Sequence, residues 1–421
     1  MTVVFCPGRN KRDHRPQRGM LYNGLTSFHP VGHPMTLSER EAQITAWLAE
    51  QKDAMIALLR EVVNIDSGTY DKAGVDAVGA RFEQFFAEHG LPTRREPNER
   101  FGDAIHIRLD DRLTNEKPVL LLGHRDTVFS KGEAERRPFR IEGDRAYGPG
   151  VADMKAGLVM NAFVLAAFRK FGAPVPVVGL ITSDEEIGSP ACRPVIETAA
   201  REARAVLNSE PGRPSGNVVT GRKGGVFMRM TVEGRPAHSG GNFEKGISAI
   251  GELAHKIIAI HKLTDLAKGT TLNVGIVRGG EAVNMVAPSA EAEIDMRYVD
   301  PPERAKTMAA IEEIVAASYV PGTRAALEIK GEFLPLNPTP SSEALFAHYQ
   351  AAARDAGLKV EGEFAGGCAD SGFTAAVGCP TICAVGPVGG AAHTPEEYLE
   401  IGSLVPRAQA MALAVMRMGA A

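Results

Sequence analysis

Carboxylate and imidazole side chains gather at the ends of several apolar segments in this sequence. The run "VVGLITSDEEIGS" (residues 177–189) places Asp184, Glu185 and Glu186 side by side after an apolar segment. Adjacent carboxylates repel each other, so an isolated group of this kind is typical of a solvated turn. A bound cation would remove the repulsion. The other chemistry-bearing residues of the chain decide between these two interpretations.

The same pattern recurs along the chain. "PVLLLGHRDTV" ends in His124 and Asp126, and "AVLNSEPG" ends in Glu210. Asp153 precedes an expected helix in "YGPGVADMKAG", and His393 follows a glycine-rich turn in "AVGPVGGAAHTPEEY". Because ligands collect beyond the carboxyl ends of the strands in open parallel sheets, we expect these side chains to converge at one edge.

This set of nitrogen and oxygen ligands suits divalent metal ions, with zinc favoured and manganese or cobalt as alternatives. Two metals are favoured over one, because five ligands with a bridging carboxylate match a paired site. Asp126 lies two residues after His124 on the same strand and would orient its imidazole ring. Glu186 would bind a metal, and Glu185 would stay free as a general base and then donate the proton to the leaving nitrogen.

The elements that must position these residues alternate between apolar strands and helices. Strands are expected over 103–109, 118–124, 175–183 and 205–210, and helices over 154–172 and 191–204. This alternation indicates an α/β fold with a mainly parallel sheet covered on both faces. Residues 221–332 instead follow the order strand–helix–strand–strand–helix–strand, which is typical of a ferredoxin-like α+β unit. We therefore expect a catalytic domain over 35–220 and 333–421, with 221–332 inserted as a separate domain.

Composition and length narrow the class of protein. The chain has 421 residues, 44% of them hydrophobic, and a net charge of −4, as expected for a globular protein of two or three domains. The sequence has no excess of basic residues that would indicate nucleic-acid binding. It also has no run of about 18 apolar residues that would predict a membrane-spanning helix. Five cysteines without a CxxC pattern fit a reducing compartment, so we expect a cytoplasmic protein. Residues 1–34 lack periodicity and are expected to form a flexible tail.

In its motifs the chain resembles the M20 family of co-catalytic metallopeptidases, in particular the carboxypeptidase G-like members. The matching segments are "GHRDTV", "GPGVADMKAG", "TSDEEIGS", "NSEPG", "GRPAHSG", "GGCADSG" and "GGAAHTPEEY". They follow the family's order and spacing from about residue 40 to the end of the chain. The resemblance implies a zinc-peptidase-like catalytic domain, with the inserted unit acting as a lid and dimerisation domain.

The resemblance also implies a division of the ligands between two metals. His124, Asp153 and Glu210 would hold one ion. Asp153 would bridge to the second ion, which Glu186 and His393 would complete.

Further roles follow from the resemblance. Glu185 would be the general base. His238, in "GRPAHSG", would reach the active site of the other subunit of a homodimer and stabilise the oxyanion there. The glycine-rich loop over 366–372 would present backbone donors near the substrate, with Gly366 and Gly367 at its start.

The same resemblance implies that two residues of the inserted unit face the substrate. Asn284 lies in "AVNMVAP" and Arg297 in "DMRYVD". The arginine would hold the substrate carboxylate, because its guanidinium fork suits bidentate binding. The alternative for Arg297 is a surface ion pair with Asp295 or Asp300.

The sequence departs from the glutamate-releasing members of the family in one respect. The segment "PGRPSGNVVTGRKGG" after Glu210 lacks an obvious counterpart to their lysine, and Arg213, Arg222 and Lys223 are its candidate substitutes. Specificity for glutamate therefore stays open.

The expected activity is dinuclear metal-dependent hydrolysis of an amide C–N bond by metal-bound hydroxide. The substrate would be small and carboxylate-bearing, such as an N-acyl amino acid or a dipeptide. One alternative is an aminohydrolase that releases ammonia from an aromatic amine, carbamoyl or amidine group. Another is a catalytically silent, metal-stabilised binding protein, against which the free base Glu185 speaks.

Overall fold

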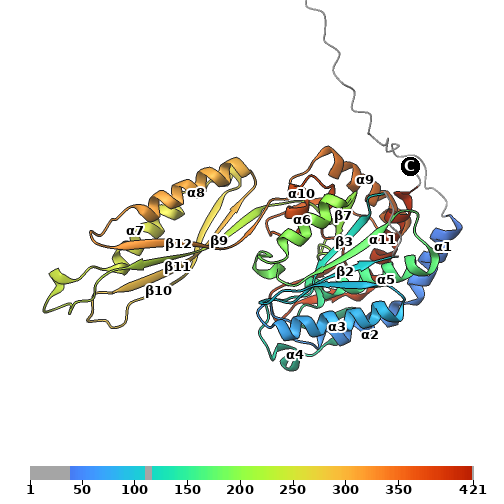
Figure 1. The fold of residues 1–421 in the computed structure, drawn as a ribbon, viewed down its shortest axis with the longest axis horizontal. Coiled ribbons are helices and arrows are strands. Elements are labelled where there is room, and N and C mark those ends of the chain that lie inside the picture. The colour runs from blue at the N-terminus through green and yellow to red at the C-terminus, as the bar shows by residue number, and fades with distance from the viewer. Residues whose placement is uncertain (1–37, 110–115, 420–421) are drawn as a thin grey trace, which may run out of the picture.

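The computed structural model describes residues 38–109 and 116–419, which form two units joined end to end (Figure 1). The larger unit is built on a sheet with helices on both faces. The smaller unit, which includes α7, α8 and β9 to β12, projects from one side of it. The predicted tail at residues 1–34 lies outside the described residues.

The larger unit contains a six-stranded sheet in the order β1-β2-β6-β3-β7-β14. Its strands are β1 (Thr93–Glu96), β2 (Ala104–Arg108), β3 (Val119–His124), β6 (Val177–Thr182), β7 (Ala205–Asn208) and β14 (Thr381–Ile382). The pairs β6–β3, β3–β7 and β7–β14 are parallel, whereas β1 and β2 add antiparallel at one edge. The prediction of a mainly parallel α/β sheet is confirmed.

Alternate residues of β3 enter two different hydrophobic cores. Leu121 packs into the larger core, whereas Leu120 and Leu122 pack into a smaller one. Helices that contribute to the larger core are α1 (Glu39–Glu50), α2 (Lys52–Val63), α3 (Lys72–Glu88), α5 (Ala156–Phe171), α9 (Pro340–Asp355) and α11 (Leu404–Arg417). The smaller core is built with α6 (Arg193–Glu202) and α10 (Ser371–Ala376), and α4 (Glu133–Arg136) is a short surface helix. Both faces of the sheet are therefore buried, which explains its continuous apolar strands.

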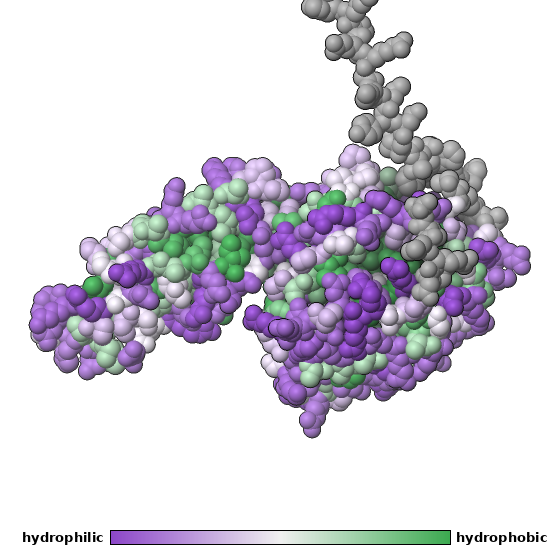
Figure 2. Space-filling model, in the orientation of Figure 1, coloured by the Kyte–Doolittle hydropathy of each residue, from purple (hydrophilic) through white to green (hydrophobic). Residues whose placement is uncertain are grey.

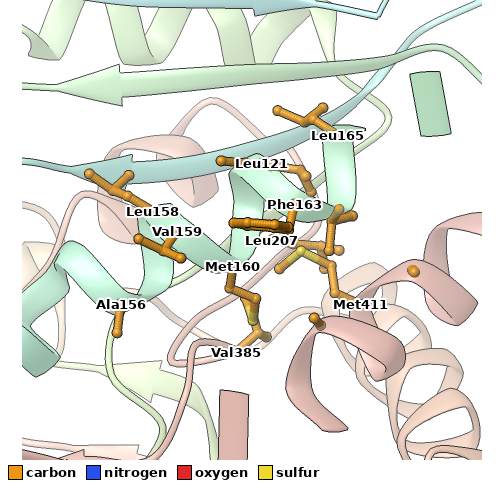
Figure 3. Packing of buried hydrophobic residues seen from close by; sticks show 14 of the residues in the cluster. Leu121, Ala156, Leu158, Val159, Met160, Phe163, Leu165, Leu207, Val385 and Met411 are labelled. Carbon is orange, nitrogen blue, oxygen red and sulfur yellow. The ribbon is translucent and has the colours of Figure 1, made fainter. Parts of the chain in front are cut away.

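Helix α5 lies at the centre of the larger core. Its residues Met160 and Phe163 lie near Leu207 of β7 and Met411 of α11 (Figure 3). The helical stretch Val151–Phe171 is long and apolar enough to cross a membrane, but 94% of its most apolar window is buried inside the protein. Its hydrophobicity is therefore that of a core helix, and the fold needs it to cover the sheet.

The smaller unit has its own sheet and its own core. Strands β9 (Gly224–Glu233), β10 (Thr271–Gly279), β11 (Ser289–Tyr298) and β12 (Arg324–Phe333) pair in the order β10-β11-β9-β12. Helices α7 (Ala249–His261) and α8 (Pro301–Ala316) contribute to one core with them, whose buried members all lie between residues 226 and 315. The expected order of strands and helices is observed. We propose the predicted division at 221–332 for this unit, and we call it the lid.

Two small sheets were not predicted from the sequence. β8 (Val218–Arg222) pairs with β13 (Gly362–Ala365), and a second sheet joins β4 (Arg140–Glu142), β5 (Arg145–Tyr147), β15 (Gly389–Gly390) and β16 (Tyr398–Glu400). Their strands are short and lack a clear alternation of apolar and polar residues, so sequence periodicity does not reveal them.

A buried lysine of α7 ties the two helices of the lid together. Lys256 of α7 lies 2.8 Å from Glu252, and both side chains are fully buried. The Lys256 ammonium also donates to the carbonyl oxygens at the end of α8, at Ile314, Val315 and Ala317. These carbonyls have no partner within their own helix, so the lysine acts as a side-chain cap.

Replacement of Lys256 should destabilise the lid. The variant Lys256→Met leaves Glu252 as an unpaired buried charge, and we expect it to lower the free energy of unfolding by about 3 kcal/mol. Guanidinium denaturation followed by circular dichroism measures this change. Lys262→Met, at the exposed end of the same helix, is the matched control. Equal stability of the two variants would contradict this role of the ion pair.

Candidate active site

Three adjacent strands deliver the predicted metal-binding side chains to one edge of the larger sheet. β3 ends at His124, Glu185 begins the turn after β6, and Glu210 follows β7. All three side chains are buried. The parallel direction of β6, β3 and β7 brings these residues together, as the sequence predicted.

Asp153 lies at the centre of the cluster, with its two carboxylate oxygens facing opposite imidazoles. Oδ1 is 3.2 Å from Nε2 of His124, and Oδ2 is 3.4 Å from Nε2 of His393. Asp153 belongs to the turn Val151–Lys155, which Gly150 introduces with a positive φ of 71°. The peptide bond after Asp153 is cis. Asp153 is thus the one carboxylate of the cluster that contacts both predicted imidazole ligands, and its bridging role stays a prediction.

The remaining predicted ligands, Glu186 and Glu210, each lie near one of these two histidines. Oε2 of Glu186 is 3.1 Å from Nε2 of His393, and Oε1 of Glu210 is 3.7 Å from Nε2 of His124. One atom each from His124, Asp153 and Glu186 lies within 4.8 Å of the others, as is true of His124, Glu185 and Glu210. The structure thus brings together all five predicted ligands and the predicted base.

The donor set fits divalent cations. Oε1 of Glu186 and Oε1 of Glu210 are buried without a hydrogen-bond partner among the described residues. Burial raises the pKa of Glu210, and burial with the charge of Asp153 raises the pKa of Glu186 to about 7. Hydrogen bonds to Asp153 and Glu186 raise the pKa of His393 to about 10. Carboxylates that crowd in this way are stabilised by a cation between them.

Asp126 holds both an imidazole and the turn that carries the two glutamates. The His124 Nδ1 lies 3.0 Å from the Asp126 carbonyl oxygen and 3.4 Å from its Oδ1. The Asp126 carboxylate also accepts the backbone N–H groups of Glu185 and Glu186, both at 3.2 Å, and the Thr69 hydroxyl at 2.7 Å. Burial raises the pKa of Asp126, but the bonds from His124 and Thr69 outweigh burial and lower it. Its orienting role stays a prediction, and the sequence did not indicate Thr69.

Glu185 lies at the cluster, and no side chain of the described residues donates a hydrogen bond to its carboxylate. Its side chain is 9% exposed, and Oε2 is 3.8 Å from Nε2 of His124. Burial, together with the carboxylates of Glu210 and Asp370, raises its pKa well above the usual value. By distance alone Glu185 groups with His124 and Glu210, so its role as the free base stays a prediction.

Glu397 fixes the turn that carries Asp153, and sequence reasoning assigned it no role. Its carboxylate is fully buried and accepts the backbone N–H groups of Gly150 at 3.0 Å and of Ala152 and Asp153 at 2.9 Å. It lies four residues after His393, so it joins the two segments that bear these ligands. The only sequence signal was its place in the quoted motif "GGAAHTPEEY".

The loop over 366–372 is held by side chains that sequence reasoning did not single out for this task. The buried carboxylate of Asp370 accepts the hydroxyls of Ser189 and of Thr182, the latter at 3.2 Å. Arg222 donates to the carbonyl oxygens of Gly367 at 3.2 Å and Cys368 at 3.4 Å. The Arg222 guanidinium therefore contacts the backbone of the loop that carries Gly366 and Gly367. The other two candidate cations are engaged elsewhere: Arg213 pairs with Glu363, and Lys223 bonds to Gly269.

Two predicted residues lie away from the cluster, in exposed turns of the lid. His238 follows β9 and accepts the N–H groups of Gly240 and Gly241 at 3.1 Å on its Nδ1. The carbonyl of Asn284 accepts the N–H of Ser239 at 3.0 Å. Within the described residues, neither side chain bonds to any predicted ligand. The catalytic role of His238 in a second subunit and the substrate-facing role of Asn284 stay predictions.

Arg297 lies where the lid meets the loop over 366–372. Its guanidinium pairs with Asp295 at 2.8 and 3.0 Å, and Nη1 is 2.8 Å from Sγ of Cys368. The alternative pairing with Asp295 is therefore present, and the contact with Cys368 brings the same side chain to the loop expected near the substrate. Its role in substrate binding stays a prediction.

A mainly parallel sheet, a convergent set of carboxylates and imidazoles, and an inserted lid define a metal-dependent hydrolase. The chain belongs to the peptidase family M20/M25/M40, whose sequence model matches residues 120–417. The family resemblance read from the sequence is confirmed, and the protein is a hydrolase of peptide or amide bonds that uses divalent metal.

Individual relatives agree with this assignment. The chain is 29% identical over 379 residues to carboxypeptidase G2 of Pseudomonas sp. (strain RS-16), covering 88% of this chain and 91% of the relative. It is 29% identical over 310 residues to acetylornithine deacetylase of Klebsiella pneumoniae (strain 342), covering 68% and 77%. An M20 family metallo-carboxypeptidase from Sulfolobus solfataricus shares the fold with a TM-score of 0.73 at 19% identity, covering 87% of this chain and 99% of that one.

Loss of the Glu397 charge should weaken metal binding. Glu397→Gln replaces one acceptor oxygen by an amide donor that faces a backbone N–H, so the Asp153 turn loosens. We expect metal affinity to fall by about 10- to 100-fold, measured by competition with a chelator. Glu396→Gln changes the exposed neighbour and should bind metal like the wild type. Equal affinities for the two variants would show that Glu397 does not position Asp153.

Proposed function

We propose that the protein hydrolyses an amide C–N bond in a small substrate with a free carboxylate, using two divalent ions. An N-acyl amino acid or a dipeptide is the favoured substrate class. The observation that carries the proposal is the position of Asp153, whose two oxygens each face a different histidine. His124 and Glu210 complete one ligand group, and Glu186 and His393 complete the other. Zinc is the favoured metal for this donor set, with manganese or cobalt as alternatives.

The metals and the chain would divide the chemistry. Two bound cations would polarise the substrate carbonyl and lower the pKa of a water molecule towards about 7. Glu185 would take a proton from the attacking water and pass it to the leaving nitrogen. Asp126 would keep the Glu185 backbone and the His124 ring in place during both transfers. Arg297 and the loop that begins at Gly366 and Gly367 would hold the substrate carboxylate.

The lid would complete the site through a homodimer. The edge strand β10 exposes Ile276 and Val277 side by side, whereas the opposite edge strand places Ile329 between exposed charges. Charged edges resist pairing and apolar edges favour it. Figure 2 shows apolar side chains on the visible face of the lid. In such a dimer, His238 and Asn284 of one subunit would act at the cluster of the other.

A reducing, cytoplasmic compartment fits the cysteines. The four cysteines among the described residues are all free. Three of them are buried, and burial raises the pKa of Cys379 to about 11. Buried neutral thiols need no oxidising environment, so we propose a cytoplasmic enzyme.

Glu185→Gln should abolish hydrolysis while both metals remain bound. The amide cannot accept the proton, and we expect kcat to fall by about 100-fold or more. N-acyl amino acids, dipeptides, aryl-glutamates and aromatic amines form the test panel, with amino acid and ammonia scored separately. Ammonia as the sole product would replace the proposal with an aminohydrolase. Neither product, despite two bound metals, would favour a binding protein.

The homodimer makes a prediction for mixed subunits. His238→Ala and Glu185→Gln should each be inactive alone, because one lacks the oxyanion donor and the other lacks the base. Unfolding and refolding them together should restore roughly a quarter of the wild-type activity, since half of the dimers are mixed and each has one complete site. Light scattering of Val277→Lys, with Ile329→Lys as the control, tests the interface. No recovery from mixing would contradict a histidine shared between subunits.

A further inference from the structure

A cavity lies beside the metal-binding cluster, and none of the roles described above uses it. It has a volume of about 470 Å³, which lies within the range of small-molecule pockets. Residues 68–71, 127–131 and 186–187 line it, so it reaches the cluster at Glu186. The cavity is therefore continuous with the site where the substrate carbonyl would be attacked.

The walls of this cavity are fixed by backbone and side-chain bonds. The carboxylate of Asp66 accepts the N–H groups of Gly132 at 2.7 Å and Ala134 at 2.8 Å. The N–H of Thr127 donates to the carbonyl oxygen of Ser67 at 2.8 Å, and the N–H of Thr69 donates to the carbonyl oxygen of Thr127 at 3.2 Å. These bonds join the segment before α3 to the segment after β3. A cavity between segments tied in this way is formed before a ligand arrives.

The cavity is also held at a set position relative to the general base. The Thr69 hydroxyl donates to Oδ2 of Asp126 at 2.7 Å. The same carboxylate accepts the N–H groups of Glu185 and Glu186. One aspartate therefore joins the cavity wall to the turn that carries the base, so a group bound in the cavity would have a defined distance to the reacting bond.

Apolar atoms make up more of the exposed surface of the cavity than polar atoms do, although Asp71, Lys131 and Glu186 also line it. Tyr70 is 67% exposed and Val128 is 43% exposed, although both line the cavity. The Tyr70 ring is supported by Phe101, with ring centroids 6.0 Å apart. The rim carries one ion pair, between Lys131 and Asp71 at 3.4 Å. An exposed, supported aromatic ring beside an aliphatic side chain fits a flat or branched apolar group.

The cavity and the loop proposed to hold the substrate carboxylate approach the cluster at different residues. The loop over 366–372 is bonded through Asp370 to Thr182, which pairs with His124 across the sheet, whereas the cavity opens at Glu186. If the carboxylate half of the substrate lies at the loop, the acyl half extends towards the cavity. This step rests on the proposed function.

We propose that the cavity binds the acyl half of the substrate, an aromatic or branched apolar group, and that Tyr70 selects it. Tyr70 would contact the acyl group through its ring face, with Val128 opposite. Small acyl groups would leave the cavity unfilled and gain nothing from it.

A series of substrates with one leaving group tests this proposal. N-acetyl-, N-pentanoyl- and N-benzoyl-alanine differ only in the acyl half, and we expect kcat/KM to rise in that order. Tyr70→Ala should lower kcat/KM for the benzoyl substrate by about tenfold or more and change the acetyl substrate little. Tyr70→Phe should retain the preference, and Val128→Trp should remove it by filling the cavity. Tyr319→Ala, an exposed aromatic residue of the lid, is the control.

Binding without turnover separates this proposal from the proposed function. Calorimetry with N-benzoyl-alanine on Glu185→Gln should show an affinity about tenfold higher than on the double variant that adds Tyr70→Ala. Equal affinities, or equal loss for acetyl and benzoyl substrates, would overturn the assignment of the cavity. A wild-type protein that hydrolyses none of the series but binds the benzoyl compound through Tyr70 would retain the cavity and overturn the proposed function.

Discussion

The active site depends on the close approach of like charges in a buried place. The carboxylates of Asp153, Glu185, Glu186 and Glu210 all lie around two imidazoles at the edge of the sheet. Two unit charges 4 Å apart repel by about 4 kcal/mol at an effective dielectric constant of 20. Such a cluster is stable only if cations or protons neutralise it. The proposed pair of divalent ions, held by the two imidazoles and Asp153, would neutralise most of it at once.

The structure around the cluster keeps these charges from moving apart. The parallel strands deliver their ends at fixed spacing, and the buried helix α5 closes the sheet behind them. Two further carboxylates, outside the predicted ligand set, accept backbone N–H groups. Asp126 holds the turn of Glu185 and Glu186, and Glu397 holds the turn of Asp153. Each ligand is therefore positioned by its neighbours before any ion binds, which lowers the cost of ordering the site.

The sequence predicted those parts of the site that follow from chain direction. His124, Glu185 and Glu210 end successive apolar strands, and parallel strands must bring such ends together. It did not predict the bonds of Glu397 or Thr69, because hydrogen bonds between distant segments leave no periodic signal. The lid was predicted from the order of its elements, since each strand and helix has its own period. The two small sheets were missed because their strands are too short to show a period of alternating apolar and polar residues.

Arg297 illustrates the same limit. The family resemblance implies that it binds the substrate carboxylate, and in the structure it pairs with Asp295 of its own strand, the alternative that the sequence left open. The contact with Cys368 joins the lid to the loop near the cluster, although these segments are far apart in sequence. Such long-range contacts depend on how the lid meets the larger unit, which local patterns do not encode.

Anomalous diffraction at the zinc edge tests the central claim most directly. Crystals of the zinc-loaded protein should show two peaks, roughly 3.5–4 Å apart, on either side of the Asp153 carboxylate. One peak should lie beside His124 and Glu210, and the other beside Glu186 and His393. A single peak, or a pair of peaks that Asp153 does not bridge, would contradict the dinuclear site.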